Sequence, residues 1–290
     1  MGGTAGAHGF SLVELERFNA VFCELAVEAG RSIMEAYANP PPVRLKADSS
    51  PVSDADEKAE ETVLRGLARL LPEFPVVSEE AVAHGAKPEV ANLFILVDPL
   101  DGTREFIAHN GEFTVNIALI ADGQPVLGVV LAPVSGALWC GGRGKAGARF
   151  ARKAMCQQMH LPLAGFADIG TRRASAGLVG VESRSHRDPL SDAWLAKRGV
   201  TQCQQIGSSM KFCLLAEGLA DVYPRFAPTM EWDTAAGDAV LRAAGGIVSG
   251  EDGQPLLYGK TGFRNGAFVA WGDPDAARRC QCDEESRGGD

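Results

Sequence analysis

Asp98-Pro99-Leu100-Asp101-Gly102-Thr103 stands directly behind a run of apolar residues, 93–97, and this junction is the most informative in the chain. The apolar run predicts a buried strand. Pro99 is expected to start a helical turn that places Asp98 and Asp101, three residues apart, on one side. Two carboxylates in that position repel each other unless a cation lies between them. We therefore expect a divalent metal ion at the end of this strand.

The second half of the motif has the features of a phosphate site. Gly102 allows the backbone to approach a ligand closely, and the N–H groups of Gly102 and Thr103 would open a short helix whose positive end favours an anion. There is a plainer interpretation, in which Asp98 caps a helix and Asp101 lies in a turn, because Asp commonly does this beside Pro and Gly. The motif by itself leaves both interpretations open.

Acidic residues at three other predicted element ends favour the metal site. Asp54 and Asp56 follow Ser53 at the start of a predicted helix, Glu79 comes just after a short apolar stretch, and Asp233 precedes an Ala-rich helix. Carboxylates that converge from several element ends provide the oxygen ligands that Mg²⁺ requires. The sequence predicts two or three Mg²⁺ ions, held by Glu79, Asp98, Asp101 and Asp233.

A hydrolytic reaction follows from this arrangement. A water molecule held between a metal ion and Thr103 becomes acidic enough to deprotonate and can attack phosphorus in line. Thr103 would pass the proton on to Asp56. We therefore expect a metal-dependent phosphomonoesterase with Asp56 and Thr103 as its catalytic residues.

The rest of the chain predicts a mixed α/β fold in two lobes. A capping box at Ser11 opens a helix that ends at Asn39, and Asp122-Gly123 predicts the turn of a hairpin within an antiparallel sheet. From about Met155, strands and helices alternate, which is typical of an α/β lobe. The expected division is an N-terminal α+β lobe with most metal ligands, a C-terminal α/β lobe with Asp233, and a polar tail that does not fold, at residues 1–154, 155–275 and 276–290.

Composition excludes several classes of protein. The 290 residues carry a net charge of −9, which argues against a nucleic-acid polymer as partner. The apolar runs of about five residues fall far short of the ~20 that a membrane helix needs. Seven cysteines without a C-x-x-C motif predict neither a disulfide framework nor a zinc site. The first six residues show no secretion or lipidation signal, so we expect a cytoplasmic protein. A peripheral position at the inner membrane and the oligomeric state stay open.

Two motifs together resemble a known superfamily. The segments 98–103 and 232–237 (Trp-Asp-Thr-Ala-Ala-Gly) are similar to those of the lithium-sensitive, magnesium-dependent phosphatases that include inositol monophosphatase and fructose-1,6-bisphosphatase. Within it the chain looks most like the bacterial 3′(2′),5′-bisphosphate nucleotidases of the CysQ type, over about residues 12 to 272. The segments that carry this likeness are 46–52, 110–116, 183–186, 207–213 and 223–226.

The resemblance implies a fold, a reaction and a site. The expected fold is the layered α/β/α/β/α sugar-phosphatase fold, and the reaction converts 3′-phosphoadenosine 5′-phosphate, a by-product of sulfate assimilation, to AMP and phosphate. The backbone carbonyl of Leu100 would join the four carboxylates as a metal ligand, and Thr103 and Asp56 would activate the water. The implied substrate-binding residues are Gly102, Thr103, Ser183, His186, Ser208, Lys211 and Arg225.

Substrate choice depends on a second cationic site. A nucleotide bisphosphate has a phosphate far from the metals, which Lys211 and Arg225 could pair with, while His186 and Ser208 could bond ribose or base. Each of these residues could instead be an ordinary surface charge or helix-end residue. Two alternatives therefore remain at this point: an inositol-phosphate or sugar-phosphate phosphatase with the same metals, and a non-catalytic phosphate sensor.

Overall fold

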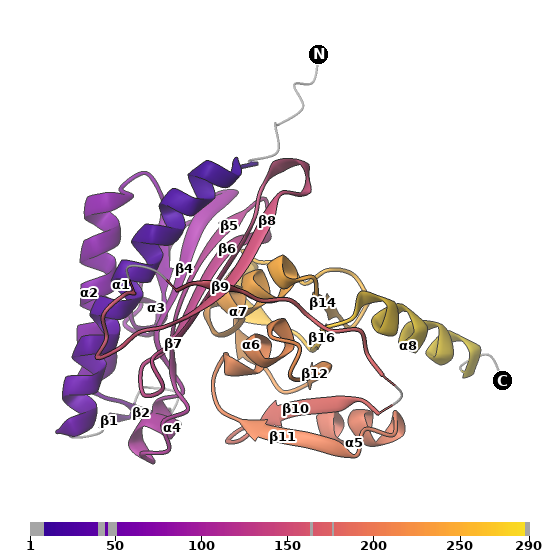
Figure 1. Ribbon diagram of the computed structural model, residues 1–290. Coiled ribbons are helices and arrows are strands. Elements are labelled where there is room, and N and C mark those ends of the chain that lie inside the picture. Colours follow the sequence, from indigo (N-terminus) through magenta and orange to yellow (C-terminus); the bar gives the residue numbers. More distant parts are fainter. Residues whose placement is uncertain (1–8, 40–43, 46–50, 163–164, 176, 288–290) are drawn as a thin grey trace.

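The computed structural model describes residues 9–39, 44–45, 51–162, 165–175 and 177–287, which form five layers (Figure 1). Two long helices cover one face of a seven-stranded sheet. Two further helices separate that sheet from a five-stranded sheet. The other face of the five-stranded sheet carries the two helices of the fifth layer. The predicted α/β/α/β/α arrangement is confirmed.

Helices α1 (Leu12–Ala38) and α2 (Asp54–Leu70) form the outer layer, and each starts where its cap residue predicts. Ser11 caps α1 in a capping box with Glu14, and Ser53 caps α2 in the same way with Asp56. The apolar stripe of each helix is buried against the seven-stranded sheet.

The seven-stranded sheet has its strands in chain order, with β3 parallel to β4 and all other neighbours antiparallel. Asp122 and Gly123, both with positive φ, form the predicted hairpin turn between β5 and β6. The strands are β3 (Val76–Ser78), β4 (Leu93–Asp101), β5 (Thr114–Ala121), β6 (Gln124–Ala132), β7 (Ala137–Arg143), β8 (Arg149–Met155) and β9 (Ala167–Asp168).

The expected helical turn at Pro99 is wrong. Strand β4 continues through Pro99 to Asp101, and its register against β5 shifts between Asp98 and Asp101, which marks an irregularity of the bulge type. Proline is tolerated there because the ladder is already interrupted. Helix α4 (Thr103–Ile107) starts only after Gly102, whose φ is 95°.

The middle layer consists of α6 (Met210–Ala216) and α7 (Glu231–Ala244). Helix α7 lies very close to the seven-stranded sheet. The measure of this is that a Cβ atom at Gly128, in β6, would lie 2.3 Å from the carbonyl oxygen of Ala236, in α7. The small residues that the sequence places on α7 make this approach possible, and they bring the first turn of α7 to the edge of the sheet.

The five-stranded sheet has the order β11-β10-β12-β16-β14, in which β11, β10 and β12 are mutually parallel. Its strands are β10 (Val179–Ser183), β11 (Gln202–Ile206), β12 (Val222–Arg225), β14 (Ile247–Gly250) and β16 (Phe268–Trp271). Helices α5 (Pro189–Lys197) and α8 (Pro274–Arg287) form the other outer layer, on the five-stranded sheet. The short elements are α3 (Glu79–Ala83), β1 (Arg44–Leu45), β2 (Pro51–Val52), β13 (Thr229–Met230), β15 (Arg264–Asn265), and the 3-10 turns Lys145–Gly147 and Thr261–Phe263.

The prediction of an unfolded C-terminal tail is wrong for residues up to 287, which lie in α8. Ala276 and Ala277 are buried against Leu195 and Trp271, and the Asp273 carboxylate accepts the N–H of Asp275 at the helix start. A few apolar contacts and a cap thus order a segment whose composition alone is polar.

The two-lobe division at residue 155 stays a prediction; Met155 ends β8, and the second sheet begins with β10. The first residues of the chain and most of the segment 46–52 lie outside the described residues. Across the described ranges, no helix has both the length and the apolarity needed to cross a membrane.

Candidate active site

One cavity of about 420 Å³ lies between the two sheets and collects nearly all the predicted site residues. Residues of the N-terminal half reach it from the start of α3, from β4 and from α4, and residues of the C-terminal half from the ends of β10 and β12, the loop after β11, and the starts of α6 and α7. The predicted residues that line it are Glu79, Asp98, Leu100, Asp101, Gly102, Thr103, Ser183, His186, Ser208, Lys211, Arg225 and Asp233. Asp56 does not line the cavity and lies behind Thr103.

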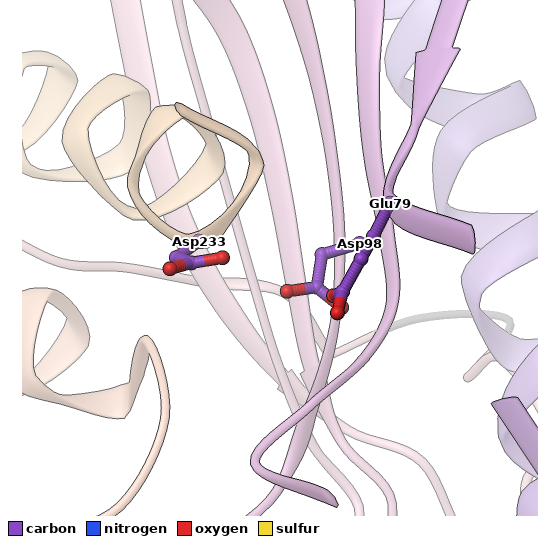
Figure 2. A group of neighbouring side chains, drawn as sticks. All are labelled: Glu79, Asp98 and Asp233. Atoms are coloured by element: carbon purple, nitrogen blue, oxygen red, sulfur yellow. The ribbon is translucent and has the colours of Figure 1, made fainter. Parts of the chain in front are cut away.

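Three carboxylates converge at one end of the cavity (Figure 2). Ser78 pairs with Val97 across the parallel strands β3 and β4, so the following residues, Glu79 and Asp98, lie side by side. Asp233 faces them from the first turn of α7. One carboxylate oxygen from each of the three lies within 4.8 Å of the others. This all-oxygen donor set fits a hard divalent cation.

The electrostatics of this end also favour a cation. Burial raises the pKa of Asp101 to about 6, an effect opposed by the positive charge of Lys211 and strengthened by Glu105. Burial also raises the pKa of Asp233, with further contributions from the negative charges of Asp101 and Glu79. Negative charges that are desolvated and mutually repelling are stabilised by a bound cation.

Asp101 lies apart from the trio of carboxylates but lines the same cavity. The register shift in β4 brings it beside Asn116, whose Nδ2 donates to Asp101 Oδ2 over 3.5 Å. The carbonyl oxygen of Leu100 accepts from Thr103 Oγ1 at 3.4 Å. Whether Asp101 and this carbonyl ligate a metal ion stays a prediction.

Thr103 and Asp56 form a hydrogen-bonded pair at the cavity wall. Thr103 Oγ1 donates to Asp56 Oδ1 over 2.9 Å, while Asp56 Oδ2 accepts from the N–H and the hydroxyl of Ser53 at 2.8 and 2.7 Å. The capping box of α2 therefore holds the carboxylate, and burial raises its pKa. Because the hydroxyl hydrogen of Thr103 points to Asp56, the lone pairs of Oγ1 are free to accept a hydrogen bond in the cavity.

Two buried cations also line the cavity. Lys211 is 4% exposed, and its Nζ donates to the carbonyl of Ser208 over 2.5 Å. Burial lowers the pKa of Lys211 to about 8. Arg225 is 8% exposed, and its guanidinium donates to the carbonyls of Ala227 and Pro228 at 3.0 and 3.3 Å. Neither residue is the solvated surface charge that the sequence left as an alternative.

Further polar residues of the lining are suited to neutral groups. The N–H of His186 donates to Ser183 Oγ at 3.1 Å. Partial desolvation, together with the positive charges of Arg225 and Arg104, lowers the pKa of His186 to about 4, so its imidazole is neutral at pH 7. Ser208 has a φ of 51°, and its buried hydroxyl has no hydrogen-bond partner among the described residues.

Arg104, Glu105 and Ser209 are among the lining residues that were not identified from the sequence. Arg104 and Glu105 follow the acidic motif directly, and the start of α4 at Thr103 turns them into the cavity wall. Ser209 adjoins Ser208, and its hydroxyl donates to Asn116 Oδ1 over 2.6 Å. Their positions next to motif residues were the available signal.

Comparison with known proteins gives consistent matches. The model of a family described as the inositol monophosphatase family matches residues 14–282. The sequence is 47% identical over 238 residues to the 3′(2′),5′-bisphosphate nucleotidase CysQ of Escherichia coli strain K12, covering 81% of this chain and 92% of that protein.

Solved structures agree with the sequence matches. The crystal structure of CysQ from Bacteroides thetaiotaomicron, a bacterial member of the inositol monophosphatase family, superposes with a TM-score of 0.72 at 38% identity, covering 90% of this chain and 99% of the other. The inositol monophosphatase of Anabaena has a TM-score of 0.68 at 23% identity, covering 93% of this chain and 97% of the other, which shows the shared fold.

Proposed function

This chain belongs to the inositol monophosphatase family, and from that premise we propose that it is a magnesium-dependent 3′(2′),5′-bisphosphate nucleotidase that converts 3′-phosphoadenosine 5′-phosphate to AMP and phosphate. It is a phosphatase, as its curated relatives are. The observation that supports the choice of substrate is the charge of the cavity lining, which contains acidic residues and also two buried cations, Lys211 and Arg225. A substrate with two phosphates can use both the metal-binding carboxylates and these cations.

The acidic end would hold two or three Mg²⁺ ions through Glu79, Asp98, Asp101 and Asp233, with the Leu100 carbonyl as a further ligand. Four carboxylates and a carbonyl are the hard oxygen donors that Mg²⁺ prefers. When bound, the ions neutralise the charge of the phosphate and lower the pKa of water.

Thr103 and Asp56 prepare the nucleophile. Because Thr103 Oγ1 already donates to Asp56, it can accept the proton of a water molecule while its own proton moves to Asp56 Oδ1. The water oxygen then forms its bond to phosphorus as the ester bond on the opposite side breaks, and the released 3′-oxygen takes a proton from solvent to become the 3′-hydroxyl of AMP. Glycine is required at position 102 beside this pair, since its φ is 95° and a Cβ there would lie only 3.2 Å from the carbonyl oxygen of Glu112.

Lys211, Arg225 and the polar residues of the second half of the chain would bind the second phosphate and the nucleoside. Lys211 and Arg225 provide charge-assisted donors to the 5′-phosphate. Neutral His186 can both donate and accept at the ribose or base, and Ser183 and Ser208 offer hydroxyl groups beside it. An inositol monophosphate has no second phosphate for these cations.

The test is phosphate release, with Mg²⁺ and with EDTA, from 3′-phosphoadenosine 5′-phosphate, inositol 1-phosphate and fructose 1,6-bisphosphate in parallel. We expect kcat/KM for the nucleotide to exceed that for inositol 1-phosphate by about 10²-fold, because a charge-assisted hydrogen bond contributes about 1.5–3 kcal/mol. EDTA should abolish all three activities. Equal rates on the three substrates would contradict the nucleotide assignment, and binding without turnover would indicate a sensor.

A further inference from the structure

A bidentate ion pair connects the two lobes beside the cavity. Arg184 follows the last residue of β10, and Glu112 lies in the loop between α4 and β5. Arg184 Nε donates to Glu112 Oε2 over 2.6 Å and its Nη2 donates to Oε1 over 2.7 Å. The same Nη2 also donates to the carbonyl of Gln205 at 2.7 Å. We call Glu112 and Arg184 the interlobe pair; neither is among the described residues that line the cavity.

The interlobe pair also holds the loop that follows β11. The N–H of Gly207 donates to Glu112 Oε2 over 2.8 Å. The loop backbone is pressed against Glu112, because a Cβ at Gly207 would lie 2.5 Å from the Glu112 carbonyl oxygen. One carboxylate therefore binds both Arg184 and this loop.

The position of the Lys211 ammonium group depends on that loop. Lys211 Nζ donates to the carbonyls of Ile206 and Ser208, at 3.3 and 2.5 Å. These two residues flank Gly207 on either side. Ser208, with its φ of 51°, is held in a conformation that a free loop would seldom adopt. A shift of Gly207 would therefore carry both carbonyls, and the ammonium group bound to them, away from its place in the cavity.

We propose that Glu112 and Arg184 are positioning residues for substrate selectivity: their ion pair holds loop residues 206–208 so that Lys211 stands where the second phosphate binds. This inference rests on the proposed function. The three converging carboxylates, Glu79, Asp98 and Asp233, lie in α3, β4 and α7, and neither Glu112 nor Arg184 belongs to these elements. Loss of the pair should therefore weaken binding of the second phosphate and leave cleavage of the first unchanged.

The pair is not expected to be essential for folding. The Arg184 side chain is 41% exposed and that of Glu112 21% exposed, and ion pairs at such positions contribute little to stability. Its rigid, bidentate geometry is instead suited to fixing an orientation.

The test compares 3′-phosphoadenosine 5′-phosphate with adenosine 3′-phosphate, which lacks only the 5′-phosphate. For Glu112→Ala and Arg184→Ala we expect KM for the bisphosphate to rise about tenfold, with kcat within about twofold and kcat/KM for adenosine 3′-phosphate within about twofold. The double variant should match the single variants, because the two residues act as one unit.

Three variants serve as controls. Arg187→Ala removes a nearby exposed ion pair with Asp192 and should leave KM and kcat unchanged for both substrates. Glu112→Gln keeps an acceptor for Gly207 and should give an intermediate KM; Arg184→Lys keeps the charge but loses the bidentate bond and should resemble Arg184→Ala. These two milder changes also serve if an alanine variant fails to fold, which thermal unfolding would reveal.

Each other outcome is informative. Equal losses on the two substrates, a fall in kcat, or an unchanged KM would overturn the positioning role. If the wild-type protein does not prefer the bisphosphate, the proposed function fails and this inference fails with it. If the wild type prefers the bisphosphate and the variants keep that preference, only the inference fails.

Discussion

Thr103 and Asp56 are separated by 47 residues in the chain, yet Thr103 Oγ1 donates to Asp56 Oδ1 over 2.9 Å. The capping box of α2 uses the other oxygen of the same carboxylate. A local helix signal thus places a proton acceptor at a fixed point, and the packing of α2 against the end of β4 brings Thr103 to it. The Asp56 carboxylate therefore caps α2 with one oxygen and, in the proposed reaction, accepts a proton with the other.

Removal of the Thr103 hydroxyl tests this pair. Thr103→Ala should lower kcat by about 10²-fold, because a positioned proton acceptor typically contributes about 10²–10⁴. Asp56→Asn should act similarly, and the double variant should be no worse than either single variant. Steady-state kinetics measure this, with Thr62→Ala in the same helix, α2, as a control, since the Thr62 hydroxyl donates to the Lys58 carbonyl and lies outside the cavity lining. Losses that multiply in the double variant would argue that the residues act separately.

Neutralising one carboxylate tests the metal site. Asp233→Asn should abolish nearly all turnover and remove the rise in Tm that Mg²⁺ causes in the wild type. Without metal the variant should melt at the same temperature or higher, because burial and the charge of Asp101 raise the pKa of Asp233 and make its charged form costly. Asn can still accept the N–H of Met230, which now donates to Asp233 Oδ2 at 2.9 Å.

Asp98→Asn should likewise lose turnover, whereas the exposed Asp192→Asn is the matched control and should keep it. Differential scanning fluorimetry with and without Mg²⁺ reports binding and folding together. A folded Asp233→Asn protein with the wild-type rate at limiting Mg²⁺ would rule out this assignment.

The pH dependence of kcat/KM should reveal the loss of the proton from the Lys211 ammonium group. Burial lowers its pKa to about 8, so the ammonium loses its proton as pH rises through that value. Only the charged form pairs with a second phosphate, and kcat/KM for 3′-phosphoadenosine 5′-phosphate should therefore fall above pH 8 by more than kcat/KM for adenosine 3′-phosphate. Lys211→Arg, which stays charged, should remove this difference. Parallel profiles for the two substrates would exclude Lys211 from the second phosphate site.

Lithium should inhibit the enzyme uncompetitively. A metal position completed in part by water and the departing phosphate would hold its ion loosely, and Li⁺ resembles Mg²⁺ in size but has half its charge. It could fill that position after cleavage and delay the release of phosphate. Substrate titrations at several LiCl concentrations, with NaCl keeping ionic strength constant, measure the effect. Identical rates in the two salts would contradict a loosely held position, though not the phosphatase assignment.

Much of this protein could be predicted from its sequence because the signals are local. Ser11 and Ser53 start their helices through bonds to residues three positions away, and Asp122-Gly123 forms its turn from its own backbone preferences. The acidic motif at the end of β4 indicated the reaction for the same reason: its residue types, in that spacing, are suited to few kinds of chemistry.

Other features depend on contacts between residues far apart in the chain. Pro99 lies within a strand and not in a helical turn because pairing with β5 continues past it, and the C-terminal helix is ordered because Ala276 and Ala277 have an apolar surface to cover. The burial of Lys211 and the ion pair between Glu112 and Arg184 depend on how segments far apart in the chain meet. The sequence by itself thus determined the helix starts, the turns and the reacting groups, since these follow from near neighbours. Only the tertiary structure decided which charges are desolvated and how they are held, because desolvation is a property of packing.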